Sequence, residues 1–400
     1  MKRSWLLLNG RGNRRSLSRF VHKRKTNRCL SSSATGPKVS PTVTVTQHYA
    51  TAGRTSSSMT LDLDRAATTQ LVDQLLQSTR RLMDQGRLSS PQQDEQPPSV
   101  QPNHQHYHHQ HNHLIAFSGG VDSSLAAALV HRCHYQDTES VRAVLGTSPA
   151  VPTEQVHLAE RMASEMGISF TMVPTTEGSD AVYLANEGKA CLACKTHLYQ
   201  TLQAIVQAQA AQPHNHHHTN NNFTLYNGTN ADDLTDPTRL GLVAAREFNV
   251  LSPLQALSKA AVRTVARHFG LSNWNYAASP CLRSRLALGV TATAEHLRLM
   301  AAAERLVRQH HAALASVVDE TTNLRVRLLA GHCVCIEIDA PLVDVVQAQD
   351  WSALQTLGGF AEVRVRAFQS GSVARREDAS VSVDQTEEEE DERPAAVGLG

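Results

Sequence analysis

Short apolar runs alternate with amphipathic stretches through the middle of the chain, and this pattern predicts the fold. The predicted strands lie at 114–117, 141–145, 168–173 and 223–226. Continuous apolar runs of this length are typical of parallel strands buried on both faces. Helical patterns lie between and after them, at 125–130, 154–166, up to about 209, and 260–269. The alternation predicts an α/β fold, a doubly wound parallel sheet with its ligand site at the carboxyl ends of the strands.

The C-terminal part has a different pattern, which predicts a smaller α+β domain. Helices are expected at 294–311, 341–347 and 353–357, and strands at 324–329, 333–338 and 361–365. We therefore divide the chain into a leader at 1–60, an N-terminal helix at 61–88, a low-complexity His/Gln loop at 89–113, a main domain at 114–290 with an insert at 212–222, a second domain at 291–375 and an acidic disordered tail at 376–400.

Charge is distributed unevenly between the two ends of the chain. The first 61 residues hold about a dozen Lys or Arg and no Asp or Glu, and Ser and Leu are interleaved with the basic residues. This composition is typical of a transit peptide and predicts a mitochondrion or plastid; a basic arm that touches nucleic acid is the alternative, and a leader that is not a transit peptide would leave the protein cytoplasmic. No run of eighteen apolar residues occurs, so we expect no membrane span.

The most informative stretch is His113–Val130, HLIAFSGGVDSSLAAALV, a predicted strand, a glycine turn and a helix start. Backbone N–H groups at a helix start bind anions, and glycine lets the backbone approach a phosphate closely. The hydroxyl groups of this turn add further donors. The turn lacks the Gly-Lys-Ser/Thr of a Walker A sequence, which argues against kinase-like handling of a γ-phosphate.

Two cysteine motifs follow this turn in the sequence. Cys191 and Cys194 form a CxxC in CLACKTHLY, and no second CxxC follows at zinc-ribbon spacing, so a redox or iron–sulfur role is favoured over structural zinc. Cys281 lies in AASPCLRSR beside Arg283 and Arg285. Neighbouring cations favour the thiolate, which both nucleophilic attack and metal ligation require, whereas a buried inert thiol is the alternative.

A polar turn, NGTNADD, follows the strand at 223–226 and carries the adjacent carboxylates Asp232 and Asp233. Such carboxylates bind Mg²⁺ or a ribose, and a helix-capping turn is the alternative. In the second domain, Arg325 and Arg327 stand at i and i+2 on one predicted strand face, where both could reach one phosphate.

Together, SGGVDSS, CLACKTHLY, NGTNADD, NVLSPLQALS and AASPCLRSR resemble the LarE family, within the PP-loop ATP pyrophosphatases. These are ATP-dependent sulfur-inserting enzymes of nickel-pincer nucleotide biosynthesis. The resemblance implies a PP-loop fold of adenine nucleotide alpha hydrolase-like type. It also implies adenylation of a carboxylate of pyridinium-3,5-biscarboxylic acid mononucleotide, followed by its conversion to a thiocarboxylate.

The resemblance also implies roles for individual residues. The ATP site would comprise Ser118, Gly119, Gly120, Asp122, Ser123, Ser124, Gly228, Thr229, Asn230 and Asp232, with Asp122 binding Mg²⁺. Cys281 would be catalytic, and Cys191, Cys194 and Cys281 match members that assemble a [4Fe-4S] cluster; in single-cysteine members the cysteine itself is sacrificed. Substrate would contact Ser284, Arg285, Arg325 and Arg327, and a metal site between subunits would use Glu304, Glu337 and Asp344.

By the same resemblance, we expect a downstream nickel-insertion protein as partner and a homo-oligomer, for which the family suggests a ring of six subunits. The alternative is another PP-loop ATP pyrophosphatase, such as a tRNA thiolase or an amidating GMP or NAD synthetase-like ligase. No glutaminase segment is present and the basic excess lies mainly in the leader, so we expect no nucleic acid partner. A nucleotide-binding regulator without ATP turnover, or an interaction protein built on the histidine tracts, is a further alternative.

Overall fold

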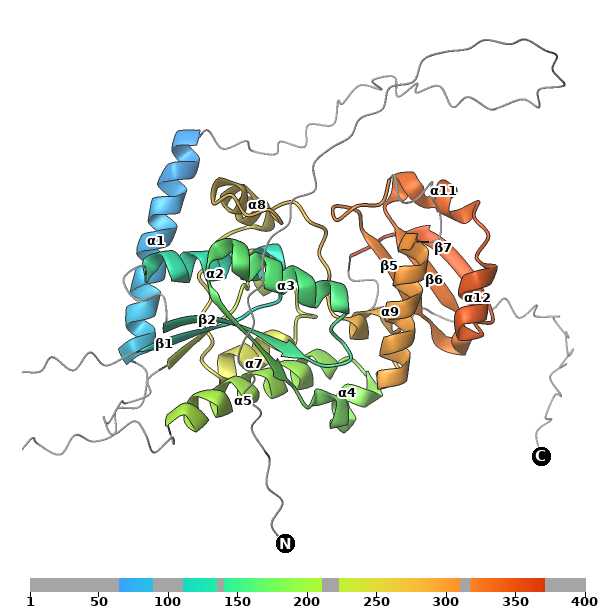
Figure 1. Ribbon diagram of the computed structural model, residues 1–400, viewed down its shortest axis with the longest axis horizontal. Coiled ribbons are helices and arrows are strands. Elements are labelled where there is room, and N and C mark those ends of the chain that lie inside the picture. Colours follow the sequence, from blue (N-terminus) through green and yellow to red (C-terminus); the bar gives the residue numbers. More distant parts are fainter. Residues whose placement is uncertain (1–64, 89–110, 135–139, 211–222, 310–316, 371–400) are drawn as a thin grey trace, which may run out of the picture. The chain divides into compact units, whose positions relative to one another are not determined.

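The computed structural model describes residues 65–88, 111–134, 140–210, 223–309 and 317–370 (Figure 1). The predictions for the leader at 1–60, the insert at 212–222 and the acidic tail at 376–400 lie outside these residues, as does nearly all of the His/Gln loop at 89–113. No helix among the described residues is long and apolar enough to cross a membrane.

A parallel sheet of four strands forms the centre of the first part of the chain. Its strands are β1 (Asn112–Ala116), β2 (Val141–Thr147), β3 (Ser169–Pro174) and β4 (Phe223–Tyr226). They are ordered β3-β2-β1-β4, so β1 pairs with β2 on one side and with β4 on the other. The predicted α/β fold is confirmed. The loops that follow β1 and β4 are therefore neighbours at the carboxyl edge of the sheet.

Helices cover both faces of this sheet, with α2, α3 and α8 on one face and α5 and α7 on the other (Figure 1). The helices of this part are α1 (Arg65–Leu88), α2 (Val121–Cys133), α3 (Thr153–Met166), α4 (Ala181–Ala185), α5 (Ala190–Ala210), α6 (Ala231–Thr235), α7 (Gly241–Glu247) and α8 (Lys259–His268). Ile115 and Leu125 are fully buried in the core on the α2 side. Burial on both faces explains why these strands are apolar throughout.

Helix ends follow local sequence signals. Helix α3 ends at Gly167, which has φ of 65° and accepts the left-handed conformation that a C-cap needs. Helix α8 begins after Ser258, whose side chain accepts a hydrogen bond from the backbone N–H of Ala261. The start of α8 places Lys259 beside the glycine turn.

The C-terminal part contains a second sheet, as the sequence pattern predicts. Its elements are α9 (Ala294–Gln309), β5 (Leu324–Leu328), β6 (Val334–Ile338), α11 (Val343–Gln347), α12 (Ser352–Gly358) and β7 (Val363–Ala367). Strands β5 and β6 are antiparallel, and β6 and β7 are parallel. Ala150 and Tyr183, from the first part of the chain, share a buried cluster with this sheet. The predicted boundary at 290/291 stays a prediction.

Candidate functional site

The glycine turn between β1 and α2 is folded by its own hydroxyl groups. Ser123 Oγ donates to the carbonyl of Gly120 at 3.0 Å and accepts from the backbone N–H of Ser118 at 3.2 Å. Gly119 has φ of 72°, and a Cβ there would lie 2.6 Å from Ala159 Cα, so the position needs glycine. The first amide groups of α2 have no helical partners, and α2 starts at the carboxyl edge of the sheet. This turn therefore has the geometry of a phosphate site.

Two side chains outside the predicted motifs clamp the turn. Asn273 is fully buried and donates to the carbonyl of Gly119 at 2.7 Å and to Ser124 Oγ at 3.1 Å. Gln155, from α3, donates to the carbonyl of Ser118. Neither residue carries a local sequence signal, because the contacts join positions 154 and 37 residues apart.

The turn after β4 packs directly against the first turn. A Cβ on Gly228 would lie 2.6 Å from the carbonyl carbon of Asp122, so only glycine fits. Asn230 donates to Asp122 Oδ1 at 3.1 Å and also caps α6 through the backbone N–H of Asp233. The neighbouring Thr229 accepts a hydrogen bond at its carbonyl from Ser252. The structure thus brings the two predicted halves of the nucleotide site together.

Asp122 has a cationic partner that the sequence motifs do not reveal. Its Oδ2 forms an ion pair with Lys259 Nζ, and the backbone N–H of Lys259 donates to Asp232 Oδ2 at 2.9 Å. Both carboxyl groups of the predicted nucleotide site therefore contact the first residue of α8. Among the described residues, no three His, Cys, Asp or Glu side chains converge closely enough to hold one metal ion.

The three predicted cysteines lie near enough to one another to interact electrostatically, although they come from two distant segments of the chain. Cys191 and Cys194 lie in the first two turns of α5, and Cys281 immediately precedes a short helix at Leu282–Arg285. Burial, followed by the charge of Cys281, raises the pKa of Cys194 to about 12, and Cys191 contributes to the same shift. The three sulfur atoms do not meet at one point in the described chain. Thiolates are the donor type that an iron–sulfur cluster uses, and the cluster on these three cysteines stays a prediction.

Two cations accompany these cysteines. Arg283 is 9% exposed and donates to Cys191 Sγ and to Asn186 Oδ1. Although burial opposes it, the charges of Cys191 and Cys281 raise the pKa of Arg283. Burial acts to lower the pKa of Lys195, but the charges of Tyr199 and Cys194 outweigh it, so this pKa is raised. Lys195 favours the thiolate of Cys194, but burial and the neighbouring Cys281 outweigh it, so the pKa of Cys194 is raised overall.

Two buried polar atoms near the cysteines have no hydrogen-bond partner within the part of the chain that the structure describes. They are the hydroxyl of Tyr183, 1% exposed, and Glu177 Oε2, in a residue 2% exposed. Burial and then the charges of Cys281 and Cys194 raise the pKa of Tyr183. An unsatisfied buried polar group costs about 1–3 kcal/mol. A site that receives a polar ligand explains why such groups are retained.

Behind the Cys281 loop lies a network of buried arginines and glutamates. Arg285 is 1% exposed; it pairs with Glu304 at 2.7 Å and donates to the carbonyl of Pro280 at 2.6 Å. Arg327 pairs with Glu337 at 2.6 Å and donates to the carbonyl of Ser284. This network holds the backbone just before Cys281, at Pro280, and within the short helix that follows it, at Ser284.

Arg325 differs from Arg285 and Arg327 because, among the described residues, its hydrogen bonds go to the backbone carbonyl groups of Ala278 and Leu324 and not to a carboxylate. Its guanidinium lies 4.8 Å from the ring centroid of Phe368. Burial, and then the positive charges of Arg285 and Arg327, lower the pKa of Arg325. An anion would relieve this repulsion. The prediction that Arg325 and Arg327 share one phosphate stays a prediction, and in the described chain Arg327 also pairs with Glu337.

The acidic residues predicted to bind metal have other partners in the single chain. Glu304 accepts from Arg285 and from the backbone N–H of Val326, and Glu337 accepts from Arg327 and Arg366. Asp344 is exposed in α11. These carboxylates form no metal site within the described chain, because arginines satisfy two of them. An intersubunit site stays a prediction.

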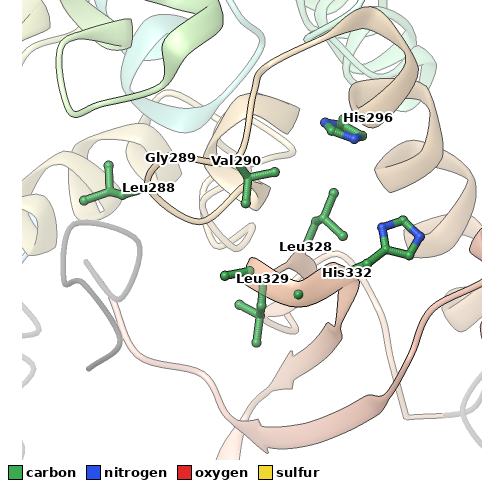
Figure 2. Close-up of a pocket in the computed structure, with 9 residues that line it drawn as sticks. Leu288, Gly289, Val290, His296, Leu328, Leu329 and His332 are labelled. Carbon is green, nitrogen blue, oxygen red and sulfur yellow. The ribbon is translucent and has the colours of Figure 1, made fainter. Parts of the chain in front are cut away.

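An open pocket of about 430 Å³ lies elsewhere, between the loop at 288–290 and the turn at 328–332 (Figure 2). Its two histidines, His296 and His332, hydrogen-bond the carbonyl groups of Thr291 and Gly358. None of the predicted site residues lines it. We therefore place the chemistry at the glycine turn and the cysteines, where the charged and nucleophilic groups are.

Comparisons with known proteins identify two sequence relatives of this chain. No protein-family model matches the chain. The uncharacterized protein slr1717 of Synechocystis sp. is 32% identical over 265 residues, which cover 66% of this chain and 91% of that protein. Pyridinium-3,5-bisthiocarboxylic acid mononucleotide synthase of Lactiplantibacillus plantarum is 29% identical over 196 residues, 48% of this chain and 66% of that protein's length.

Solved structures give weaker similarities. An NH3-dependent NAD synthetase from Campylobacter jejuni has a TM-score of 0.34 at 12% identity, covering 63% of this chain and 88% of that chain. An NMN synthetase from Francisella tularensis has a TM-score of 0.33 at 14% identity, covering 52% and 75%. These values are too low to carry an inference.

Proposed function

We propose that this chain, a member of the LarE-like PP-loop family, is an ATP-dependent sulfur transferase. It belongs to one family with slr1717 of Synechocystis sp.. The proposed substrate is pyridinium-3,5-biscarboxylic acid mononucleotide, one carboxylate of which is adenylated and converted to a thiocarboxylate. The observation that carries the proposal is the grouping of Cys191, Cys194 and Cys281 with two cations, Arg283 and Lys195. An amidating ligase has no use for three neighbouring thiols.

The glycine turn performs the first half of the reaction. A substrate carboxylate oxygen attacks the α-phosphorus of ATP, the bond from that phosphorus to the bridging oxygen breaks, and pyrophosphate leaves. The start of α2 and the hydroxyls of Ser118 and Ser123 bind the departing phosphates. Asp122 has the carboxylate oxygens that Mg²⁺ prefers, and the ion when bound neutralises pyrophosphate. Asn230 orients this carboxylate through Oδ1.

The cysteines perform the second half. A sulfur nucleophile attacks the acyl carbon, the bond from that carbon to the AMP oxygen breaks, and AMP leaves with the electron pair. A [4Fe-4S] cluster on Cys191, Cys194 and Cys281, when bound, would supply an exchangeable sulfide. Arg283 holds Cys191 in position through its hydrogen bond, and Lys195 adds positive charge near the same sulfur atoms.

We assign the substrate phosphate to Arg325, whose hydrogen bonds within the described residues go to backbone carbonyl groups and not to a carboxylate. Arg285 and Arg327 act indirectly, since they hold the backbone of Pro280 and Ser284 around Cys281. The product thiocarboxylate is a soft ligand suited to nickel, so the proposed partner is a nickel-insertion protein. A homo-oligomer and an organelle location belong to the same proposal.

Anaerobic reconstitution of the leaderless protein with iron and sulfide tests this function. Wild type, Cys191→Ala and Cys281→Ala are compared for a cluster spectrum and for ATP-dependent sulfur transfer to the pyridinium substrate. Cys333→Ala is the matched control, since Cys333 lies just before β6, outside the cysteine group.

A cluster spectrum with several turnovers per protein, lost in both site variants and kept in the control, would support the three-cysteine route. A single turnover with loss of sulfur from Cys281 would instead support the sacrificial route. If the wild type transfers no sulfur at all, neither repeatedly nor once, the sulfur transferase assignment is refuted and another PP-loop ligase becomes the better assignment.

A further inference from the structure

The ion pair between Lys259 and Asp122 occupies the carboxylate that the proposed function gives to Mg²⁺. Asp122 Oδ1 accepts from Asn230 and Oδ2 contacts Lys259 Nζ, so neither oxygen is left without a partner. An ammonium group on Oδ2 competes with a divalent cation for that oxygen, because the two positive charges repel each other at close range. Binding of Mg²⁺ to Asp122 is therefore favoured when Lys259 moves away.

The anchoring of Lys259 allows this movement. Its backbone N–H is held by Asp232 Oδ2 at 2.9 Å, and Ser258 caps the start of α8 beside it. The side chain is 30% exposed, so its flexible four-carbon stem can swing while the backbone stays in place. Because Asp122 is the second residue of α2, the ammonium group already lies at the helix start that would bind phosphate.

No other described cation forms an ion pair with Asp122. The nearby Arg263 donates to the carbonyl groups of Trp274 and Tyr276, and Arg267 stacks on the ring of Trp274. These two cations of α8 are engaged away from the turn. Lys259 is therefore the cation of α8 that lies close enough to the glycine turn to bind the phosphates of a nucleotide there.

We propose that Lys259 holds the cation position of Asp122 in the nucleotide-free enzyme and transfers to the phosphates when Mg²⁺ and ATP bind. In this role Lys259 is a catalytic residue that neutralises the leaving pyrophosphate, and its ion pair keeps Asp122 shaped for the metal. The inference rests on the proposed use of ATP and Mg²⁺, and it does not depend on the sulfur chemistry.

The test measures Mn²⁺ affinity by electron paramagnetic resonance without nucleotide, and ATP affinity by equilibrium dialysis with Mg²⁺. In Lys259→Met the ammonium no longer competes, so Mn²⁺ should bind about fivefold more tightly, as expected for loss of a partly exposed ion pair. ATP should bind roughly tenfold more weakly, because a charged donor to phosphate is lost. Lys259→Arg keeps the charge and should retain weak Mn²⁺ binding.

Lys189→Met, at an exposed lysine, is the matched control and should leave both affinities unchanged. Adding Asp122→Asn to Lys259→Met should abolish the gain in Mn²⁺ affinity. If Lys259→Met fails to fold, Lys259→Gln gives the same comparison, with circular dichroism as the check on folding.

Unchanged Mn²⁺ and ATP affinities in a folded Lys259 variant would overturn the inference and reduce the ion pair to a structural contact. Neither measurement uses the pyridinium substrate or the cysteines. Failure of sulfur transfer would therefore refute the proposed function while the result for Lys259 stood.

Discussion

Replacing Glu337 by Gln tests whether the glutamate network behind the Cys281 loop is structural or metal-binding. Glu337 is fully buried, and its Oε2 accepts from Arg327 Nε at 2.6 Å while Oε1 accepts from Arg366 Nη2 at 2.8 Å. The change keeps the volume of the side chain and removes its charge. Arg327, 6% exposed at its side chain, would then be a buried cation without a carboxylate.

The magnitude follows from this burial. Breaking a buried ion pair by removing one partner costs about 3–5 kcal/mol, because the remaining charge is left uncompensated in a region that excludes water. The adjacent strand β7 provides a matched comparison. Glu362 and Arg364 form an ion pair at the same distance, 2.6 Å, but their side chains are 51% and 54% exposed. Glu362→Gln should cost much less, because water screens this exposed pair.

Urea unfolding of wild type and both variants, each with and without a chelator, measures these differences. We expect a large loss for Glu337→Gln, a small loss for Glu362→Gln, and no effect of the chelator on either difference. Equal losses in the two variants would refute the burial argument. A Glu337 effect that disappears on chelation would show that the carboxylate binds a metal after all.

Three further predictions concern the two halves of the proposed site. Asn273→Ala should destabilise the fold by about 2–3 kcal/mol, because two buried acceptors lose their donor, and it should also raise the KM for ATP. Urea unfolding measures the first effect and steady-state kinetics the second. An unchanged KM would exclude a role of Asn273 in shaping the glycine turn. Tyr183→Phe should stabilise the metal-free protein by about 1 kcal/mol by removing an unsatisfied hydroxyl, and a loss of stability would show that this hydroxyl has a partner. In the folded chain the pKa of Cys194 is raised to about 12, above the ~8.5 of a free thiol. The protonated thiol therefore stabilises the metal-free fold at neutral pH. This contribution is lost as the pH rises toward 12. The difference in urea midpoint between wild type and Cys194→Ala should therefore change above about pH 9, and a constant difference across that range would contradict the shift.

The elements that carry local signals could be predicted from the sequence. Apolar runs locate the four strands of the parallel sheet to within about two residues, and Gly167 marks the end of α3 because a C-cap requires its left-handed conformation. The glycine turn is recognisable because its chemistry is contained in seven consecutive residues, Ser118–Ser124. Local sequence is sufficient wherever the interacting groups are neighbours in the chain.

The groups that complete the site depend on contacts between distant positions. Lys259 and Asp122 are 137 residues apart, and Arg285 reaches Glu304 only once α9 packs beside β5. A serine N-cap predicts where α8 begins but not what its first side chain contacts. The same limit applies to Glu304 and Glu337, because a carboxylate in sequence carries no sign of the arginine that pairs with it. Their role in a metal site between subunits stays a prediction from the family resemblance.

The most direct measurement quantifies AMP, pyrophosphate and thiocarboxylate together in one anaerobic reaction of the reconstituted protein with ATP, Mg²⁺, sulfide and the pyridinium biscarboxylate mononucleotide. Sulfur transfer through an acyl adenylate predicts that the three products form in equal amounts and that none forms without ATP. Release of AMP and pyrophosphate with an amide in place of the thiocarboxylate, or no ATP cleavage at all, would contradict the proposed function.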